Sequence, residues 1–125
     1  MNNHKVGSCL CNSVVYEVKG DFDSFYLCHC GRCRKDTGSA HAANLFSATA
    51  ELSWLSGEDK IKTYNLPSTL HTRAFCTNCG SDLPVQMDNG ILVVPAGNLA
   101  SEIGITPDAR LVVSASETCD NQLAT

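Results

Sequence analysis

Short runs of alternating apolar and polar residues characterise this chain, and none of them has the period of a long helix. Across residues 14–19, Val14, Tyr16 and Val18 occupy every second position. A period of two, with β-branched and aromatic residues, is typical of a strand with one buried face. Similar short segments follow, separated by residues that favour turns. We expect further strands at residues 22–27, 40–46, 51–55, 61–64, 72–75, 83–87, 91–94 and 110–115.

The segments between these strands read mainly as turns. Asn89-Gly90 is a strong hairpin signal between residues 83–87 and 91–94. Residues 31–38 are charged and rich in turn formers, so they allow one or two helical turns at most, and residues 98–103 are expected to form a short helix. Many short strands without a long amphipathic helix predict a mainly β fold of short antiparallel sheets. The length of 125 residues predicts one domain spanning residues 1–125.

Composition and charge narrow the functional classes. The chain is 43% hydrophobic with a net charge of −4, which suits a globular protein and argues against a nucleic-acid partner. No apolar run approaches the roughly 20 residues of a membrane span. The strongest run, residues 91–96, reads as a buried strand. Since the first residues are not followed by a signal-peptide core, we expect a cytoplasmic protein.

The cysteines carry the chemical signal, because seven of the eight gather in three groups. Two closely spaced cysteines supply half of a tetrahedral zinc site from one stretch of backbone. An even cysteine count also suits a disulfide-bonded secreted domain, but the absence of an export signal and the C-x-C and C-x-x-C spacings favour metal. Seven thiols divide as four plus three, which predicts one closed site and one site with an open position. The groups are Cys9 and Cys11; Cys28, Cys30 and Cys33; and Cys76 and Cys79.

Local geometry suggests how these groups present their sulfurs. In extended backbone, Cys9 and Cys11 would face the same side, and so would Cys28 and Cys30, with His29 between them turned away from the metal. We expect His29 near the site or on the surface and not as a ligand.

Two glycines next to the cysteines are expected to shape the turns. Gly80 would take a positive φ after the last pair, so that amide groups can point at sulfur, and Gly31 would play the comparable part in the middle group. Spacing does not determine which groups share an ion. Proximity along the chain favours joining the first group to the middle one.

The order of motifs resembles the glutathione-dependent formaldehyde-activating enzyme family. The elements that carry the resemblance are Gly7–Cys11, Cys28–Arg34 and Arg73–Ser81, and the likeness extends over roughly residues 7–113. It implies a zinc-containing "β-tent" of short twisted sheets, a fold shared with an exchange factor for Rab proteins. It also implies a carbon–sulfur lyase that joins formaldehyde to glutathione, giving S-hydroxymethylglutathione.

The resemblance also implies roles for the cysteines. It pairs the first group with the last, so that Cys9, Cys11, Cys76 and Cys79 would hold a structural Zn²⁺. The second, labile Zn²⁺ would be held by Cys28, Cys30 and Cys33, which are then the expected catalytic set. An open position on a three-thiolate zinc would accept a small thiol such as glutathione. The basic residues beside this group, Arg32, Arg34 and Lys35, would be placed to meet its carboxylates.

Two other functions fit parts of the pattern. A non-catalytic zinc module that binds a protein partner would be favoured if His29 or Cys119 closed the second site. A nucleic-acid or cytoskeletal module, as in relatives of centromere protein V, conflicts with the acidic balance. Three thiols in the middle group favour the enzyme.

The remaining candidates are expected to be structural. His4, His41 and His71 lack metal-like spacing and read as surface or sheet residues. Arg73 is expected to form hydrogen bonds near the last cysteine pair. Cys119 stands alone and reads as an ordinary cysteine of the C-terminal tail.

Overall fold

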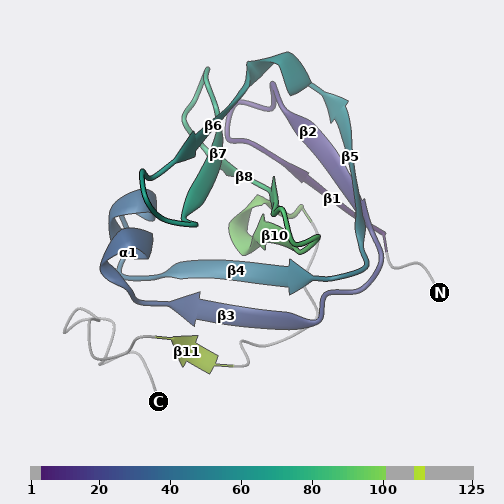
Figure 1. Cartoon of the computed structure of the whole chain (residues 1–125). Helices are drawn as coiled ribbons and strands as arrows, with labels where there is room; N and C mark the ends of the chain where they lie inside the picture. The colour runs from purple at the N-terminus through teal and green to yellow at the C-terminus, as the bar shows by residue number, and fades with distance from the viewer. Residues whose placement is uncertain (1–3, 101–108, 112–125) are drawn as a thin grey trace.

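Three small β-sheets surround one core, giving the triangular outline of Figure 1. The computed structural model describes residues 4–100 and 109–111. The first sheet contains β1 (His4–Ser8), β2 (Val15–Lys19) and β5 (Glu51–Ser56). The second contains β3 (Ser24–Cys28), β4 (Ala42–Ser47), β9 (Val85–Gln86), β10 (Leu92–Pro95) and β11 (Ala109–Leu111). The third contains β6 (Ile61–Asn65), β7 (Thr72–Cys76) and β8 (Asp82–Leu83).

Helical structure is confined to three short segments of the described residues. They are α1 (Gly31–Thr37) and the 3₁₀ turns η1 (Glu58–Lys60) and η2 (Ala96–Asn98). The strand pairs are antiparallel except for β11, which runs parallel to β3. The mainly β prediction is therefore confirmed, and α1 matches the one or two turns expected. No helix in the described part of the chain is long and apolar enough to cross a membrane.

The chain ties the sheets together by passing repeatedly from one to another. It leaves the first sheet after β2, returns to it at β5, and then crosses to the third sheet through Gly57. Gly57 has φ 75°, and a Cβ there would lie 2.0 Å from the carbonyl oxygen of Ser13. Only glycine fits this crossing without rearrangement.

Pro84 makes the other sharp crossing, from β8 in the third sheet to β9 in the second. The expectation of one strand over residues 83–87 is wrong, because proline has no N–H to continue a ladder. The predicted hairpin that follows is confirmed. Gly90 has φ 89°, and the Met87 amide donates to the Ile91 carbonyl at 2.8 Å.

The structure differs from the sequence predictions in two further places. The strand β1 was not predicted, and its residues pair with β2 from His4↔Lys19 to Ser8↔Val15. The helix expected at 98–103 is replaced by η2, after which Leu99 is extended (φ −74°, ψ 135°). Residues 101–103, and residues 112–115 of the last predicted strand, lie outside the described residues.

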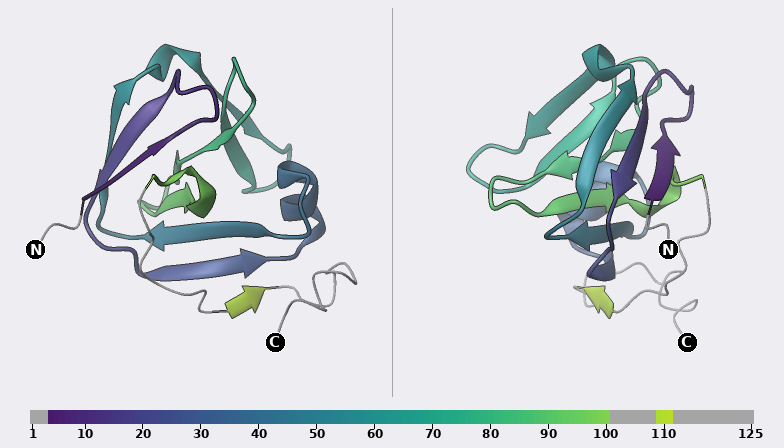
Figure 2. Two further views of the ribbon diagram at one scale, coloured as in Figure 1. Left: turned by 180° about the vertical axis from the view of Figure 1, so that it is seen from behind. Right: turned by 90° about the vertical axis from the view of Figure 1, so that its right-hand side faces the viewer.

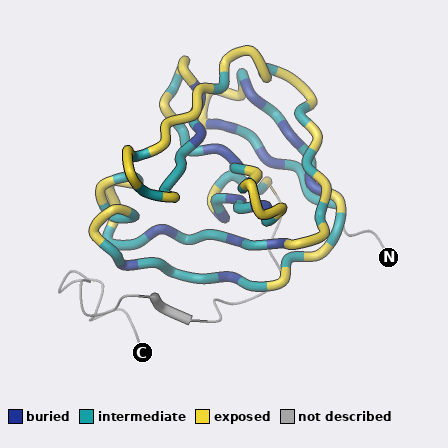
Figure 3. The backbone as a smooth tube through the Cα atoms, viewed as in Figure 1, coloured by how far each residue is buried: buried dark blue, intermediate teal, exposed yellow. Residues whose placement is uncertain are grey.

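The core lies between the sheets, and buried residues alternate with less buried ones along β2 and β10 (Figure 3). Tyr16 is fully buried and makes an edge contact with Trp54, with ring centroids 5.7 Å apart. Its hydroxyl donates to Asn98 Oδ1 at 3.2 Å, which satisfies the polar end of the ring. The views in Figure 2 show the three sheets around this common interior. The other largest buried apolar side chains include Val14, Val18, Leu45, Leu92 and Val94.

Candidate metal centre

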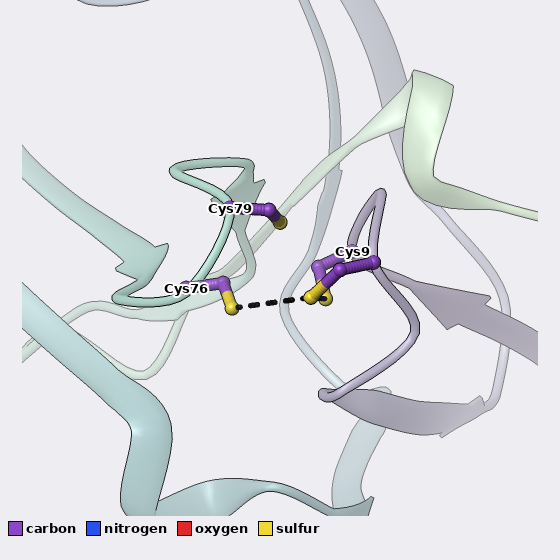
Figure 4. Close-up of side chains that lie close together, drawn as sticks. Cys9, Cys76 and Cys79 are labelled. Carbon is purple, nitrogen blue, oxygen red and sulfur yellow. Dashed lines mark hydrogen bonds between the residues drawn. The ribbon is translucent and has the colours of Figure 1, made fainter.

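Four cysteine sulfurs converge where the β1–β2 loop meets the β7–β8 loop. The Sγ atoms of Cys9, Cys11, Cys76 and Cys79 all lie within 4.8 Å of one another. Cys9 and Cys11 Sγ are 3.6 Å apart, and Cys11 and Cys76 Sγ are 4.0 Å apart. Tetrahedral zinc with Zn–S bonds of about 2.3 Å requires sulfurs about 3.8 Å apart. The donor set and its spacing therefore fit a zinc ion, and Figure 4 shows Cys9, Cys76 and Cys79 pointing toward one another.

The first loop reaches this geometry by a turn and not by the extended backbone that we expected. The Asn12 amide donates to the Cys9 carbonyl at 3.2 Å, and Asn12 has φ 64°. As a consequence Cys9 is buried while Cys11 is exposed. In the second loop the prediction for Gly80 is confirmed, since its φ is 80° and its amide donates to the Cys76 carbonyl at 2.7 Å.

Hydrogen bonds from both loops reach the sulfurs. The Val14 amide donates to Cys9 Sγ at 3.3 Å, and the side-chain amide of Asn78 donates to Cys11 Sγ at 3.1 Å. Such donors stabilise metal-bound thiolates and fix their direction.

The same surroundings set the pKa values of these thiols. Burial raises the pKa of Cys9. Hydrogen bonds with Ser13 and then Asn78 lower the pKa of Cys11 to about 7. Hydrogen bonding with Ser81 lowers the pKa of Cys79 to about 5. Two of the four thiols thus favour the thiolate form that metal ligands require.

The second cluster contains Cys28 at the end of β3, Cys30 just before α1, and Cys33 within α1. Their Sγ atoms lie within 4.8 Å of one another, and all three residues are partly exposed. Cys30 Sγ accepts a hydrogen bond from the Cys33 amide at 3.3 Å. Among the described residues the cluster has three ligands, so a zinc ion there would retain an open position.

The thiols of this cluster differ in pKa. Burial acts to raise the pKa of Cys30, but the Cys33 amide and the neighbouring thiols lower it overall. Burial, followed by the nearby Cys28 and Cys30, raises the pKa of Cys33. Gly31 does not have the positive φ that we expected, because it is the first residue of α1. The turn is made by the helix itself, whose Arg34 amide donates to the Cys30 carbonyl at 3.0 Å.

His29 is fully buried and does not belong to either cysteine cluster. Its ring packs against His41, with centroids 5.2 Å apart. The expectation that it is not a ligand agrees with this placement, whereas a surface position does not. Cys119 lies outside the described residues.

A cavity of about 190 Å³ opens beside the three-cysteine cluster, with Cys33 in its wall. α1 also contributes Asp36 to this wall, one helical turn after Cys33. The loop before β7 contributes His71 to the same wall, and the third sheet contributes Arg73 and Asp82. The cavity therefore combines several ionisable side chains with one thiol of the three-cysteine cluster, as binding and active sites often do.

The basic residues next to the three-cysteine group lie in α1 beside Cys33 but do not line this cavity. Arg32 and Lys35 are exposed, and neither they nor Arg34 line the cavity. The helix presents Asp36 to the cavity because residues three apart share a helix face. Two features of the sequence could have predicted that these ionisable residues gather at the cavity. They are the three-residue spacing of Cys33 and Asp36, and the alternation of His71 and Arg73 before Cys76.

Arg73 makes the structural hydrogen bonds predicted for it. Its Nη2 donates to the Gly80 carbonyl at 3.0 Å, and its Nε donates to Asp82 Oδ1. Burial raises the pKa of Asp82, and Arg73 opposes that shift. Arg73 thus connects the wall of the cavity to the last cysteine loop.

Comparison with known protein families gives a match over most of the chain. The sequence model of the glutathione-dependent formaldehyde-activating enzyme family matches residues 4–115. The chain belongs to this family. The resemblance seen in the three cysteine motifs is confirmed.

A solved structure shows a similar fold. The crystal structure of a Rhodobacter sphaeroides protein, a Northeast Structural Genomics target, matches with a TM-score of 0.62 and 23% identity. The match covers 86% of this chain and 99% of the other chain. No match was found among the curated proteins.

Proposed function

We propose that this single-domain protein is a zinc-dependent carbon–sulfur lyase that forms or cleaves a hydroxymethyl adduct of a small thiol. Glutathione is the proposed thiol and formaldehyde the proposed electrophile, giving S-hydroxymethylglutathione. The observation that carries the proposal is the three-cysteine cluster with Cys33 in the wall of a cavity. Family membership supports the choice of glutathione and formaldehyde.

The two cysteine clusters would hold two zinc ions with different roles. Cys9, Cys11, Cys76 and Cys79 would hold a structural ion, which clamps two loops distant in sequence. Cys28, Cys30 and Cys33 would hold the catalytic ion, whose open position favours the thiolate form of an incoming thiol. Because all seven thiols are free in the structure, a reducing compartment such as the cytoplasm belongs to the proposal.

The protein's own residues would bind the thiol and confine the electrophile. The cavity admits a small aldehyde next to Cys33, and its apolar wall includes Phe46, Leu83 and Val93. Holding thiol and aldehyde together converts a bimolecular addition into a step within one complex. The addition needs no reductant or oxidant, since the thiol hydrogen and sulfur both enter the product.

The test combines zinc content with product formation. Reduced, gently purified protein is expected to contain two zinc ions per chain and to accelerate adduct formation from glutathione and ¹³C-formaldehyde, followed by NMR. The Cys30→Ser variant is expected to keep the structural ion, lose the second one, and lose most of the acceleration. Unchanged turnover in this variant would refute a catalytic role for the cluster. Two bound zinc ions without turnover would instead favour a non-catalytic module for a protein partner.

A further inference from the structure

His71 and Asp36 form a hydrogen-bonded pair in the wall of the cavity beside the three-cysteine cluster. His71 Nε2 lies 2.9 Å from Asp36 Oδ2, and both residues line the cavity that contains Cys33. The two side chains are 24% and 16% exposed, so they are accessible but largely enclosed. His71 lies in the loop before β7 and Asp36 lies in α1, 35 positions away in sequence.

The surrounding charges hold Asp36 in a position to orient His71. Arg73 Nε is 2.8 Å from Asp36 Oδ1, and the same nitrogen contacts Asp82. The single Nε–H donates to Asp82, so the guanidinium gives Asp36 Oδ1 a neighbouring positive charge but no hydrogen bond, and Asp36 Oδ2 contacts the imidazole. The ionisable residues that line the cavity together with His71 are Asp36 and Cys33 from α1, Arg73 from β7 and Asp82 from β8.

The hydrogen bond to Asp36 determines which nitrogen of the imidazole can accept a proton. An ionised carboxylate can only accept, so His71 Nε2 carries the proton that it shares with Asp36. In the neutral ring the other nitrogen, Nδ1, then has a lone pair and can take up a proton. A histidine oriented by a carboxylate is a recurrent arrangement for general acid–base chemistry.

We propose that His71, oriented by Asp36, transfers the proton during addition of the thiol to the aldehyde. This inference rests on the proposed function and deepens it. The thiol gives its S–H proton to Nδ1 of His71. The sulfur then forms a bond to the aldehyde carbon, the C=O π bond breaks, and its electron pair moves to oxygen. The same proton passes from Nδ1 to that oxygen, so that thiol and aldehyde give the hydroxymethyl adduct with every atom conserved.

The reverse reaction uses the same residue. The adduct hydroxyl returns its proton to Nδ1, the C–S bond breaks as the carbonyl forms, and the departing sulfur regains the proton. Asp36 acts as a positioning residue in both directions, since it touches the imidazole and not the reacting atoms.

The first arm of the test measures turnover as a function of pH in the zinc-loaded protein. His71→Gln keeps a donor for Asp36 but cannot shuttle a proton, and we expect kcat to fall about 10²–10⁴-fold with little change in zinc content. The acidic limb of the pH profile should disappear with it. His4→Gln is the matched control, because His4 also pairs with a carboxylate, Glu17, but does not line the cavity.

The second arm separates proton transfer from a structural role. In His71→Ala, added imidazole is expected to raise turnover at least tenfold. If His71 had only a structural role, imidazole would not raise it. Asp36→Asn should lower kcat about tenfold while leaving KM nearly unchanged. Imidazole ¹⁵N spectra provide a readout independent of turnover, since glutathione should shift the His71 signals and not those of His4.

The outcomes distinguish this inference from the proposed function. Zinc-loaded wild-type protein without turnover would overturn both. An active wild type whose His71→Gln variant stays within threefold of it at every pH would overturn the inference alone. Loss of turnover with an unaltered pH profile and no imidazole rescue would also overturn it, because His71 would then be structural.

Discussion

The amide of Leu10 donates a hydrogen bond to Ser81 Oγ at 2.9 Å, joining the two loops of the four-cysteine cluster across 71 positions of sequence. Ser81 Oγ is also 3.3 Å from Cys79 Sγ. Since the serine oxygen accepts from Leu10, its own hydroxyl proton is available to a Cys79 thiolate. Ser81 thus holds the two loops together and also stabilises the thiolate of Cys79, a proposed zinc ligand.

Replacing this serine should weaken metal binding more than it weakens the fold. We expect Ser81→Ala to reduce zinc affinity at the four-cysteine site about 10–100-fold, the usual effect of losing a partner of a metal ligand. Competition with a chromogenic chelator would measure it. Ser53→Ala on the exposed side of β5 is the control, and equal zinc affinities in both variants would contradict the prediction.

The two cysteine clusters should differ in their effect on folding. Cys76 is completely buried and belongs to the cluster that joins β7–β8 to β1–β2, so Cys76→Ser should remove a zinc ion coupled to folding. We expect a loss of several kcal/mol, beyond the ~0.5–3 kcal/mol of most substitutions. Thermal unfolding of zinc-loaded protein checks this, with the Cys30→Ser variant expected to unfold close to the wild type. Equal destabilisation by the two substitutions would show that both clusters are structural.

The crossing at Gly57 should tolerate a side chain less well than the turn at Gly90. Gly57→Ala meets both the backbone cost of positive φ and a Cβ contact of 2.0 Å with Ser13. We expect a destabilisation of about 2–5 kcal/mol by chemical denaturation. Gly90→Ala isolates the backbone cost, since its φ is 89° and nothing lies within 4 Å of its Cβ, and should cost only about 1–2 kcal/mol. A Gly57→Ala variant no less stable than Gly90→Ala would disprove this account of the turn.

The interaction between Glu17 and His4 should make the free energy of unfolding depend on pH. The hydrogen bond from His4, followed by the charges of His4 and Lys19, lowers the pKa of Glu17. A carboxyl whose pKa is lower in the folded state stabilises that state above its unfolded pKa, and this stabilisation is lost as pH falls through the folded pKa. Glu17→Gln should therefore reduce the free energy of unfolding near neutral pH and have a smaller effect in acid. Denaturation at several pH values, with the exposed Glu51→Gln as control, checks the slope; a pH-independent difference would refute it.

Much of the local structure was predictable because it depends on residues near one another in sequence. The alternation around Tyr16 predicted β2, and Asn89-Gly90 predicted the turn before β10. The strand β1 was missed because it is short and mostly half-buried, so its apolar period is weak. Pro84 divided a predicted strand because the chain changes sheets there.

The sequence alone determined that seven cysteines fall into three groups with the spacing of metal ligands, because ligand spacing is a local property. Spacing along the chain left the pairing of the groups open, and only the tertiary structure shows the sulfurs of the first and last groups together, as the family resemblance implied. The sheets bring Cys9 and Cys11 to Cys76 and Cys79, although the middle group is closer along the chain. The same folding places His71 against Asp36 beside Cys33, since sheet packing, unlike spacing, determines which distant side chains meet.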